Sequence, residues 1–87
     1  MIDRIVLIQT CMACPEQYDA YIDDVKVAYL RLRHGYFYVQ MPYDSENKIY
    51  EAYPAGDGLF EDWERELYLN MAKLKILEFM LSFSALS

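Results

Sequence analysis

The sequence predicts an α+β fold in which an antiparallel β-sheet of four to five strands is packed on one face by a long C-terminal helix. Residues 25–41, V-K-V-A-Y-L-R-L-R-H-G-Y-F-Y-V-Q-M, alternate in character with a period of two, which is typical of β-strands. From residue 59 onward, apolar residues recur at helical spacing instead. Strands followed by a helix within 87 residues indicate a single domain spanning 1–87.

The centre of the predicted sheet is a hairpin of strands 25–33 and 36–41 joined at His34 and Gly35. Gly35 supplies the positive φ that a two-residue turn requires. In this register one face carries Ala28, Leu30, Leu32, Phe37, Val39 and Met41. The other face carries Tyr29, Arg31, Arg33, Tyr36, Tyr38 and Gln40. We expect the first face to form the core and the second to meet solvent, a ligand or a partner.

Two strands are predicted before the hairpin, at residues 3–10 and 17–22, although a short helix over the second segment is an alternative. Asp23 and Asp24 are predicted to form a tight turn into the hairpin. That turn would place Tyr18 opposite Tyr29, on the tyrosine and arginine side. It would place Asp19 on the core side.

The last predicted strand covers residues 48–53 and follows a turn rich in Pro, Asp, Ser and Asn. A four-residue loop would put Tyr50 and Ala52 on the core face and Glu51 and Tyr53 on the other. Across three strands this predicts one row of Arg31, Tyr38 and Tyr53. A neighbouring row would hold Tyr29, Gln40 and Glu51.

The C-terminal helix is predicted over residues 59–82, with Asp57 as its N-cap. We expect it to pack an apolar stripe onto the core face of the hairpin: Phe60, Trp63, Leu67, Met71 and Leu74. Residues 76–83 are apolar nearly all round the helix. We expect this apolar surface to be buried, either by the N-terminal strand or by a second chain, so a homodimer or partner contact is expected here.

Composition narrows the class of protein. The chain is 55% hydrophobic and 25% charged, with 14 acidic and 8 basic residues and a net charge of −6. This charge disfavours direct nucleic-acid binding, which needs a basic surface. We find no apolar run long enough to span a membrane and no signal peptide, so we expect an intracellular protein.

The motif Cys11-x-x-Cys14 has three interpretations. It could be a dithiol redox site of the thioredoxin kind, although the segment after it does not resemble the helix such sites use. It could be half of a structural zinc site with His34 as third ligand. The fourth ligand would then be Asp44, Glu46, Asp57, a water or a second chain. It could also be two reduced, partly buried cysteines.

The sequence contains no recognisable pair of nucleophile and base, so we expect a protein that is not an enzyme. The tyrosine and arginine side of the sheet is the better functional candidate. Such residues can stack bases, clamp phosphates or anchor a protein interface. A purely structural alternative is a polar sheet surface on which Arg31 pairs with Glu51.

Several segments carry a resemblance: C-P-E-Q-Y-D, Y-L-R-L-R-H-G-Y-F, Y-E-A-Y-P-A-G-D-G and E-R-E-L-Y-L. They resemble a small family of uncharacterised proteins carried by low-GC Gram-positive bacteria, their phages and their mobile elements. This resemblance implies that the intracellular location would be the cytoplasm of a bacterial host. In size and acidity the chain is also similar to phage-encoded anti-CRISPR inhibitors. This second resemblance implies a non-enzymatic protein that binds a large basic effector nuclease and interferes with nucleic-acid loading.

The leading hypothesis is therefore a protein-binding inhibitor, of the anti-CRISPR or another anti-defence kind. Its predicted partner-binding residues are Tyr29, Arg31, Arg33, Tyr36, Tyr38, Glu51, Tyr53, Glu61, Asp62 and Glu64. The acidic residues would steer the protein to a basic surface, and the tyrosines would anchor it. Two alternatives remain open. One is a nucleotide-binding or anion-binding module that uses the same sheet face, and the other is a dithiol redox protein.

Overall fold

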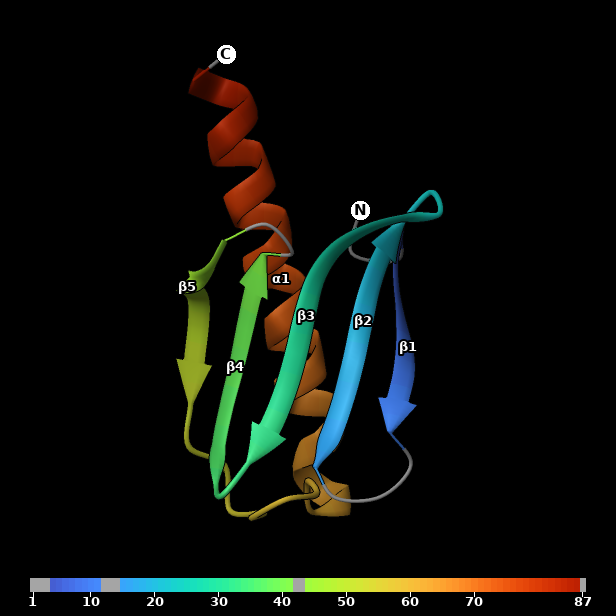
Figure 1. Ribbon diagram of the computed structural model, residues 1–87, viewed down its shortest axis with the longest axis vertical. Coiled ribbons are helices and arrows are strands. Elements are labelled where there is room, and N and C mark those ends of the chain that lie inside the picture. Colours follow the sequence, from blue (N-terminus) through green and yellow to red (C-terminus); the bar gives the residue numbers. More distant parts are fainter. Residues whose placement is uncertain (1–3, 12–14, 42–43, 87) are drawn as a thin grey trace.

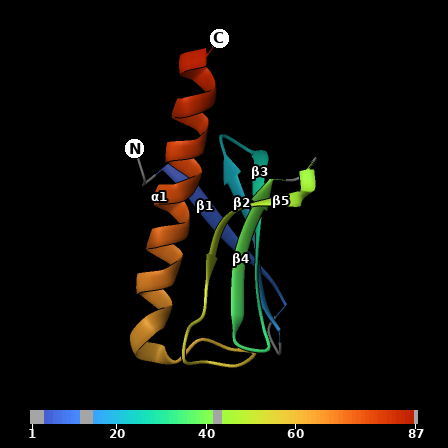
Figure 2. The ribbon, with the colours of Figure 1, turned by 90° about the vertical axis from the view of Figure 1, so that its left-hand side faces the viewer.

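The computed structural model describes residues 4–11, 15–41 and 44–86. Five strands are followed by one helix: β1 (Ile5–Cys11), β2 (Glu16–Ile22), β3 (Val25–Arg33), β4 (Tyr36–Met41), β5 (Asp44–Ala52) and α1 (Asp62–Leu86). The strands form one antiparallel sheet in chain order, and α1 packs against one face of it (Figures 1 and 2). The predicted α+β fold is confirmed.

Both predicted two-residue turns are present. At the β3–β4 connection His34 and Gly35 have φ values of 54° and 71°. At the β2–β3 connection Asp23 and Asp24 have φ values of 50° and 67°. Two consecutive positive φ values are characteristic of the turns whose twist matches that of a hairpin. The β3–β4 register is the predicted one, with Arg33 opposite Tyr36, so the two faces of the hairpin are divided as expected.

The prediction for β2 is wrong by one residue. A bulge at Val27 pairs Ala20 with Ala28, so Asp19 lies opposite Tyr29. Because side chains alternate with a period of two, a one-residue shift exchanges the faces. Tyr18 is therefore buried in the core, whereas Asp19 joins the tyrosine and arginine side. The bulge buries Val27 and Ala28 together, and no local sequence signal marks it.

The helix begins at Asp62 rather than at residue 59, and Asp57 does not cap it. Two carboxylates hold the chain that leads into the helix. Glu64 accepts the backbone N–H of Glu61 at 2.9 Å, which is the reverse arm of a capping box. Glu16 accepts the N–H of Phe60 at 3.0 Å. The loop before α1 is thus fixed by buried side chains from both layers, and the helix starts after it.

The helix also packs with a different face from the predicted one. Its buried apolar residues are Ala72 and Ile76, and Tyr68, Leu69, Leu77 and Met80 pack beside them. Phe60 is buried as expected, with its ring 5.0 Å from that of Phe37. The prediction is wrong for Trp63, Leu67 and Leu74, which are exposed. The sequence offers two apolar stripes on opposite sides of α1, and the side containing the small Ala72 meets the sheet.

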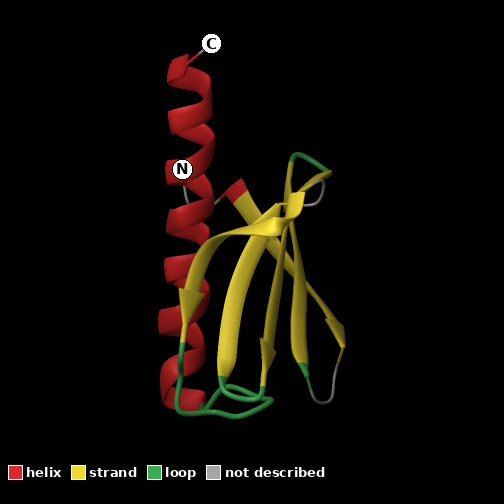
Figure 3. Cartoon of the chain, turned by 60° about the vertical axis from the view of Figure 1, so that its left-hand side comes forward, coloured by secondary structure: helices red, strands yellow, loops and turns green. Residues whose placement is uncertain are grey.

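The C-terminal turns of α1 extend past the end of the sheet (Figures 1 and 3). Within the described residues, no helix is long and apolar enough to cross a membrane.

Candidate functional site

The helix α1 lies along one side of the sheet (Figure 2), and the predicted tyrosine and arginine residues alternate with the core residues and lie on the other side. We call it the tyrosine–arginine face and define it by residues from three strands and the chain just after β5: Tyr29, Arg31, Arg33, Tyr36, Tyr38, Glu51 and Tyr53. The register of β3, β4 and β5 brings these seven residues together. Seven of the ten predicted partner-binding residues therefore share one surface.

Four tyrosines of this face form a continuous ladder. The ring centroids of Tyr29 and Tyr38 are 6.3 Å apart, those of Tyr38 and Tyr36 are 5.5 Å apart, and those of Tyr36 and Tyr53 are also 5.5 Å apart. The rings are mutually tilted, an arrangement that favours aromatic packing. Tyr53, at the outer end, is 76% exposed. The ladder is thus a preformed aromatic surface with one open end.

The predicted rows across the sheet are shifted. Tyr38 lies opposite Glu51, two residues away from the predicted pairing with Tyr53, because irregularities at Gln40 and an earlier start of β5 change the register. A shift of two residues keeps every side chain on its face. Tyr50 and Ala52 consequently pack against the core, as predicted.

The tyrosine–arginine face is locally basic. Four cations lie on it among the described residues: Lys26, Arg31, Arg33 and Lys48. Two carboxylates, Asp19 and Glu51, lie beside them. Lys48 sits over the Tyr38 ring at 5.0 Å and Lys26 near the Tyr29 ring at 5.9 Å. In a chain of net charge −6, half of the basic residues gather on this one surface.

Hydrogen bonds fix several of these side chains. The Tyr29 hydroxyl donates to Gln17 Oε1 at 2.6 Å. Burial and a hydrogen bond to the Glu51 carboxylate raise the pKa of Tyr36 to about 12. Among the described residues Arg31 has no ion pair with Glu51, so the structural alternative of a cross-strand pair is not realised. The buried Arg31 Nε has no hydrogen-bond acceptor in the described part of the chain.

The three predicted acidic residues of the helix do not belong to this face. Glu61 and Asp62 are exposed at the start of α1, in the layer on the other side of the sheet. Glu64 is buried, and its carboxylate accepts the backbone N–H groups of Ala55, Gly56 and Glu61. Glu64 is predicted from the sequence to bind a partner, but in the structure its carboxylate is buried and occupied by these three backbone contacts.

A second buried carboxylate, Glu16, was not singled out from the sequence. It accepts from Arg65 Nε at 2.9 Å, from the Phe60 N–H and from the Tyr18 hydroxyl. Burial opposes its ionisation, but the hydrogen bonds from Arg65, Tyr18 and Phe60 outweigh burial and lower the pKa of Glu16. This cluster ties β2 to the start of α1. Glu64 could have been found from its place three residues after the helix cap, whereas no local pattern marks Glu16.

The described residues do not bring a metal site together. No group of three or more His, Cys, Asp and Glu side chains suited to hold a metal occurs in residues 4–11, 15–41 and 44–86. Cys11 ends β1 half-buried, and His34 is exposed at the β3–β4 turn, where Arg33 Nε donates to it at 3.2 Å. Cys14 and the side chains of Asp44 and Glu46 lie outside the described part. The zinc and redox hypotheses for Cys11 and Cys14 therefore stay predictions.

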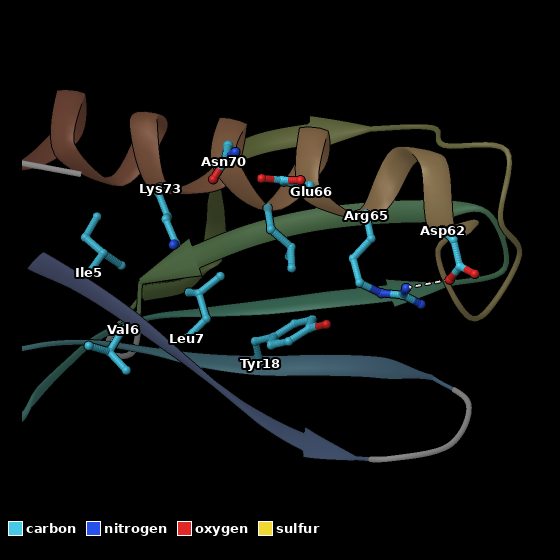
Figure 4. A pocket seen from close by; sticks show the side chains of 10 residues that line it. Ile5, Val6, Leu7, Tyr18, Asp62, Arg65, Glu66, Asn70 and Lys73 are labelled. Atoms are coloured by element: carbon cyan, nitrogen blue, oxygen red, sulfur yellow. Dashed lines mark hydrogen bonds and ion pairs between the residues drawn. The ribbon is translucent and has the colours of Figure 1, made fainter. Parts of the chain in front are cut away.

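Two pockets lie away from the tyrosine ladder, and the smaller one reaches Arg31 and Arg33 at the hairpin end of the face. One, of about 360 Å³, lies at the end of the hairpin and is lined by Pro15, Arg31, Arg33, His34, Asp57 and Gly58. The other, of about 630 Å³, separates β1 from α1 (Figure 4). In the second pocket Arg65 is paired with both Asp62 and Glu16. Its guanidinium is committed to holding the fold, so this pocket is a weaker candidate for function.

Comparisons with protein-family models, with curated proteins and with solved structures found no match. The tyrosine–arginine face, on the geometry described above, is the candidate functional site.

Proposed function

We propose that this is a non-enzymatic binding protein that uses the tyrosine–arginine face to contact another protein. The observation that carries the proposal is the ladder of four tyrosines. It lies on the side of the sheet that α1 does not cover (Figure 2). Tyrosine and arginine dominate the binding energy of protein interfaces because they combine large apolar area with polar tips. A sheet surface that merely faced solvent would not require four packed aromatic rings.

The shape of the surface favours a macromolecule over a small ligand. Small-molecule sites are concave and enclose most of their ligand. The tyrosines of the ladder lie outside both pockets described above. A partner of this face would therefore lie across the strands of β3, β4 and β5.

Among macromolecules, a protein fits better than a nucleic acid. Bases stack on open ring faces, but lysine ammonium groups occupy positions over the Tyr38 and Tyr29 rings. The net charge of −6 also opposes approach to a polyanion. The local excess of cations on the face suits a partner surface with exposed carboxylates.

The kind of partner we propose is a nucleic-acid-handling effector, such as a type II CRISPR nuclease. The similarity in size and acidity to anti-CRISPR inhibitors supports this part of the proposal. Exposed carboxylates away from the sheet face, including Asp23, Asp24, Glu61 and Asp62, would stand beside the bound effector. Their charge would repel a nucleic acid from the adjoining surface, and inhibition would be stoichiometric.

A titration against a purified type II effector nuclease tests the proposal. Binding by calorimetry and inhibition of DNA cleavage are measured with the effector before and after guide loading. We expect saturable binding with inhibition that tracks occupancy. Absence of both a complex and inhibition, even at low salt, would refute this function for the effector tested.

An anion-binding module remains a second candidate because of one observation. Arg31 and Arg33 both line the pocket at the hairpin end, and Arg31 Nε has no acceptor within the described residues. Guanidinium groups favour phosphate. A thermal-shift screen with nucleotides discriminates the two candidates: a specific shift that Arg33→Ala abolishes supports the module, and no shift favours the protein binder.

A further inference from the structure

The outer side of α1 carries an exposed apolar stripe. Trp63, Leu67, Leu74 and Leu81 are 73%, 57%, 42% and 59% exposed. These large side chains lie on the side of the helix away from Ala72 and Ile76, which face the sheet. Among the described residues, Figures 2 and 3 show no strand or loop over that side of the helix. A contiguous stripe of this kind usually marks an interaction site.

The spacing of the stripe identifies its partner as another helix. Its positions are Trp63, Leu67, Asn70, Leu74, Leu77 and Leu81, separated by four and three residues in strict alternation. Five of the six are exposed, and Leu77 is half-buried at the margin, where it also packs against the core. This is the heptad repeat that keeps an a/d seam facing a second helix. The seam runs for ~27 Å along α1 at the rise of an α-helix. A helix face that packs only on the sheet of its own chain does not require a 3.5-residue period, whereas a face that packs on a second helix does.

From this spacing, exposure and charge, we infer that α1 is a dimerisation helix and that its partner is α1 of a second copy of this chain, aligned in parallel. In a parallel pair each seam residue meets its own counterpart. Asn70 then faces Asn70 of the second copy, and a single polar layer of this kind fixes the register of a coiled coil. Trp63 likewise meets its own counterpart at the N-terminal end.

The flanking charges agree with a parallel pair. Lys73 precedes the Leu74 layer and Glu78 follows the Leu77 layer, so Lys73 of one copy reaches Glu78 of the other, twice per dimer. Within its own chain Glu78 also pairs with Lys75 at 3.3 Å. In an antiparallel pair centred on the seam, Lys73 would instead meet Lys73 of the second copy, which is repulsive.

The rest of the fold suits this assembly. Packing on the sheet already orders α1, so association does not have to form the helix. The pocket between β1 and α1 is lined on the helix side by Glu66, Asn70 and Lys73, so Asn70 borders both this pocket and the seam (Figure 4). Because the exposed seam residues lie on the side of α1 away from the sheet, both tyrosine–arginine faces of the dimer remain open. The inference is independent of what that face binds.

Sedimentation equilibrium of the purified chain over a range of concentrations tests the inference. We expect a mass twice the 10.3 kDa of one chain. Leu67→Glu places two unpaired charges in the seam and should raise the dimer dissociation constant about 30-fold or more. Val25→Glu is the matched control, because Val25 is 62% exposed but lies on the sheet, and it should not change the mass.

A charge exchange tests the orientation. Lys73→Glu and Glu78→Lys should each weaken the dimer, and the double variant should recover it, since the exchanged charges still attract in a parallel pair. A mass of one chain at every concentration would overturn the inference. The same result would be obtained if the seam bound a helix of another protein instead of a second copy. A dimer that Leu67→Glu leaves intact would overturn it equally, and lack of recovery in the double variant would overturn the parallel alignment.

Discussion

Glu64→Gln is the substitution that tests most sharply how the start of the helix is built. Glu64 Oε2 accepts the N–H groups of Gly56 at 2.8 Å and of Glu61 at 2.9 Å, and Oε1 accepts the Ala55 N–H at 2.9 Å. Glutamine has the same shape but only one carbonyl oxygen. With that oxygen in the Oε2 position, its NH2 group would face the Ala55 N–H, donor against donor.

The magnitude follows from these contacts. The variant loses one hydrogen bond outright and turns two charge-assisted bonds into neutral ones. Hydrogen bonds to charged groups contribute about 1.5–3 kcal/mol each, and an unsatisfied buried donor costs a similar amount. Part of this is offset because a neutral amide is easier to bury than a carboxylate. We expect the free energy of unfolding to fall by about 2 kcal/mol.

Urea unfolding followed by circular dichroism measures the change. Circular dichroism is preferable to fluorescence because Trp63 is already 73% exposed in the folded protein. Glu66→Gln is the control: it lies on the same helix and is exposed, so its effect should stay within about 0.5 kcal/mol. If Glu64→Gln is as neutral as Glu66→Gln, the three backbone contacts do not hold the loop and the reasoning is refuted.

Three further predictions concern the same junction. Gly56→Ala should cost about 3 kcal/mol in urea unfolding, because an added Cβ would lie 2.0 Å from the Leu59 carbonyl oxygen. Gly35→Ala should cost about 1 kcal/mol, because φ is +71° there but the added Cβ would meet only Asp57 Oδ1, at 3.9 Å. Equal costs would contradict this. Arg65→Met leaves buried Glu16 without its counter-ion and should lower the free energy of unfolding by about 3 kcal/mol. Lys75→Met, which breaks the more exposed pair with Glu78, should lower it by only about 0.5 kcal/mol. A cost below about 1 kcal/mol for Arg65→Met would show that Glu16 is satisfied without Arg65. Burial opposes ionisation of Glu16 and Glu64, but their hydrogen bonds lower the pKa of each below 4.5. Their contribution to the free energy of unfolding should therefore be complete above pH 4.5 and should fall as the pH drops through the folded pKa values. Urea midpoints measured across this pH range would record the loss, and a midpoint that stays constant into acid would contradict the assignment.

The fold class and the two faces of the hairpin could be predicted because they depend on local patterns. Alternation from Tyr29 to Gln40 and the turn residues His34 and Gly35 fix the β3–β4 register without knowledge of the rest. The gathering of tyrosines and arginines on one surface followed from that register alone. The candidate site was accordingly predicted in its main residues.

The remaining features depend on contacts between distant parts of the chain. The bulge at Val27 reverses Tyr18 and Asp19, and it is set by what the core accommodates rather than by the sequence around it. The helix offers two apolar sides, and only packing decides that Ala72 faces the sheet while Leu67 stays outside. Glu16 lies 49 residues from its partner Arg65, so no local spacing could pair them.

The proposal that the tyrosine ladder binds a protein is tested most directly by the binding constant of a ladder variant. Tyr36→Ala combined with Tyr38→Ala removes the centre of the ladder, and Leu59→Ala alters an exposed apolar residue in the loop before α1. In calorimetry with the type II effector nuclease, we predict that the double variant binds at least about 30-fold more weakly, while Leu59→Ala binds like the parent. Equal affinity of the parent and the double variant, with the fold intact by circular dichroism, would contradict the assignment of the tyrosine–arginine face as the binding surface.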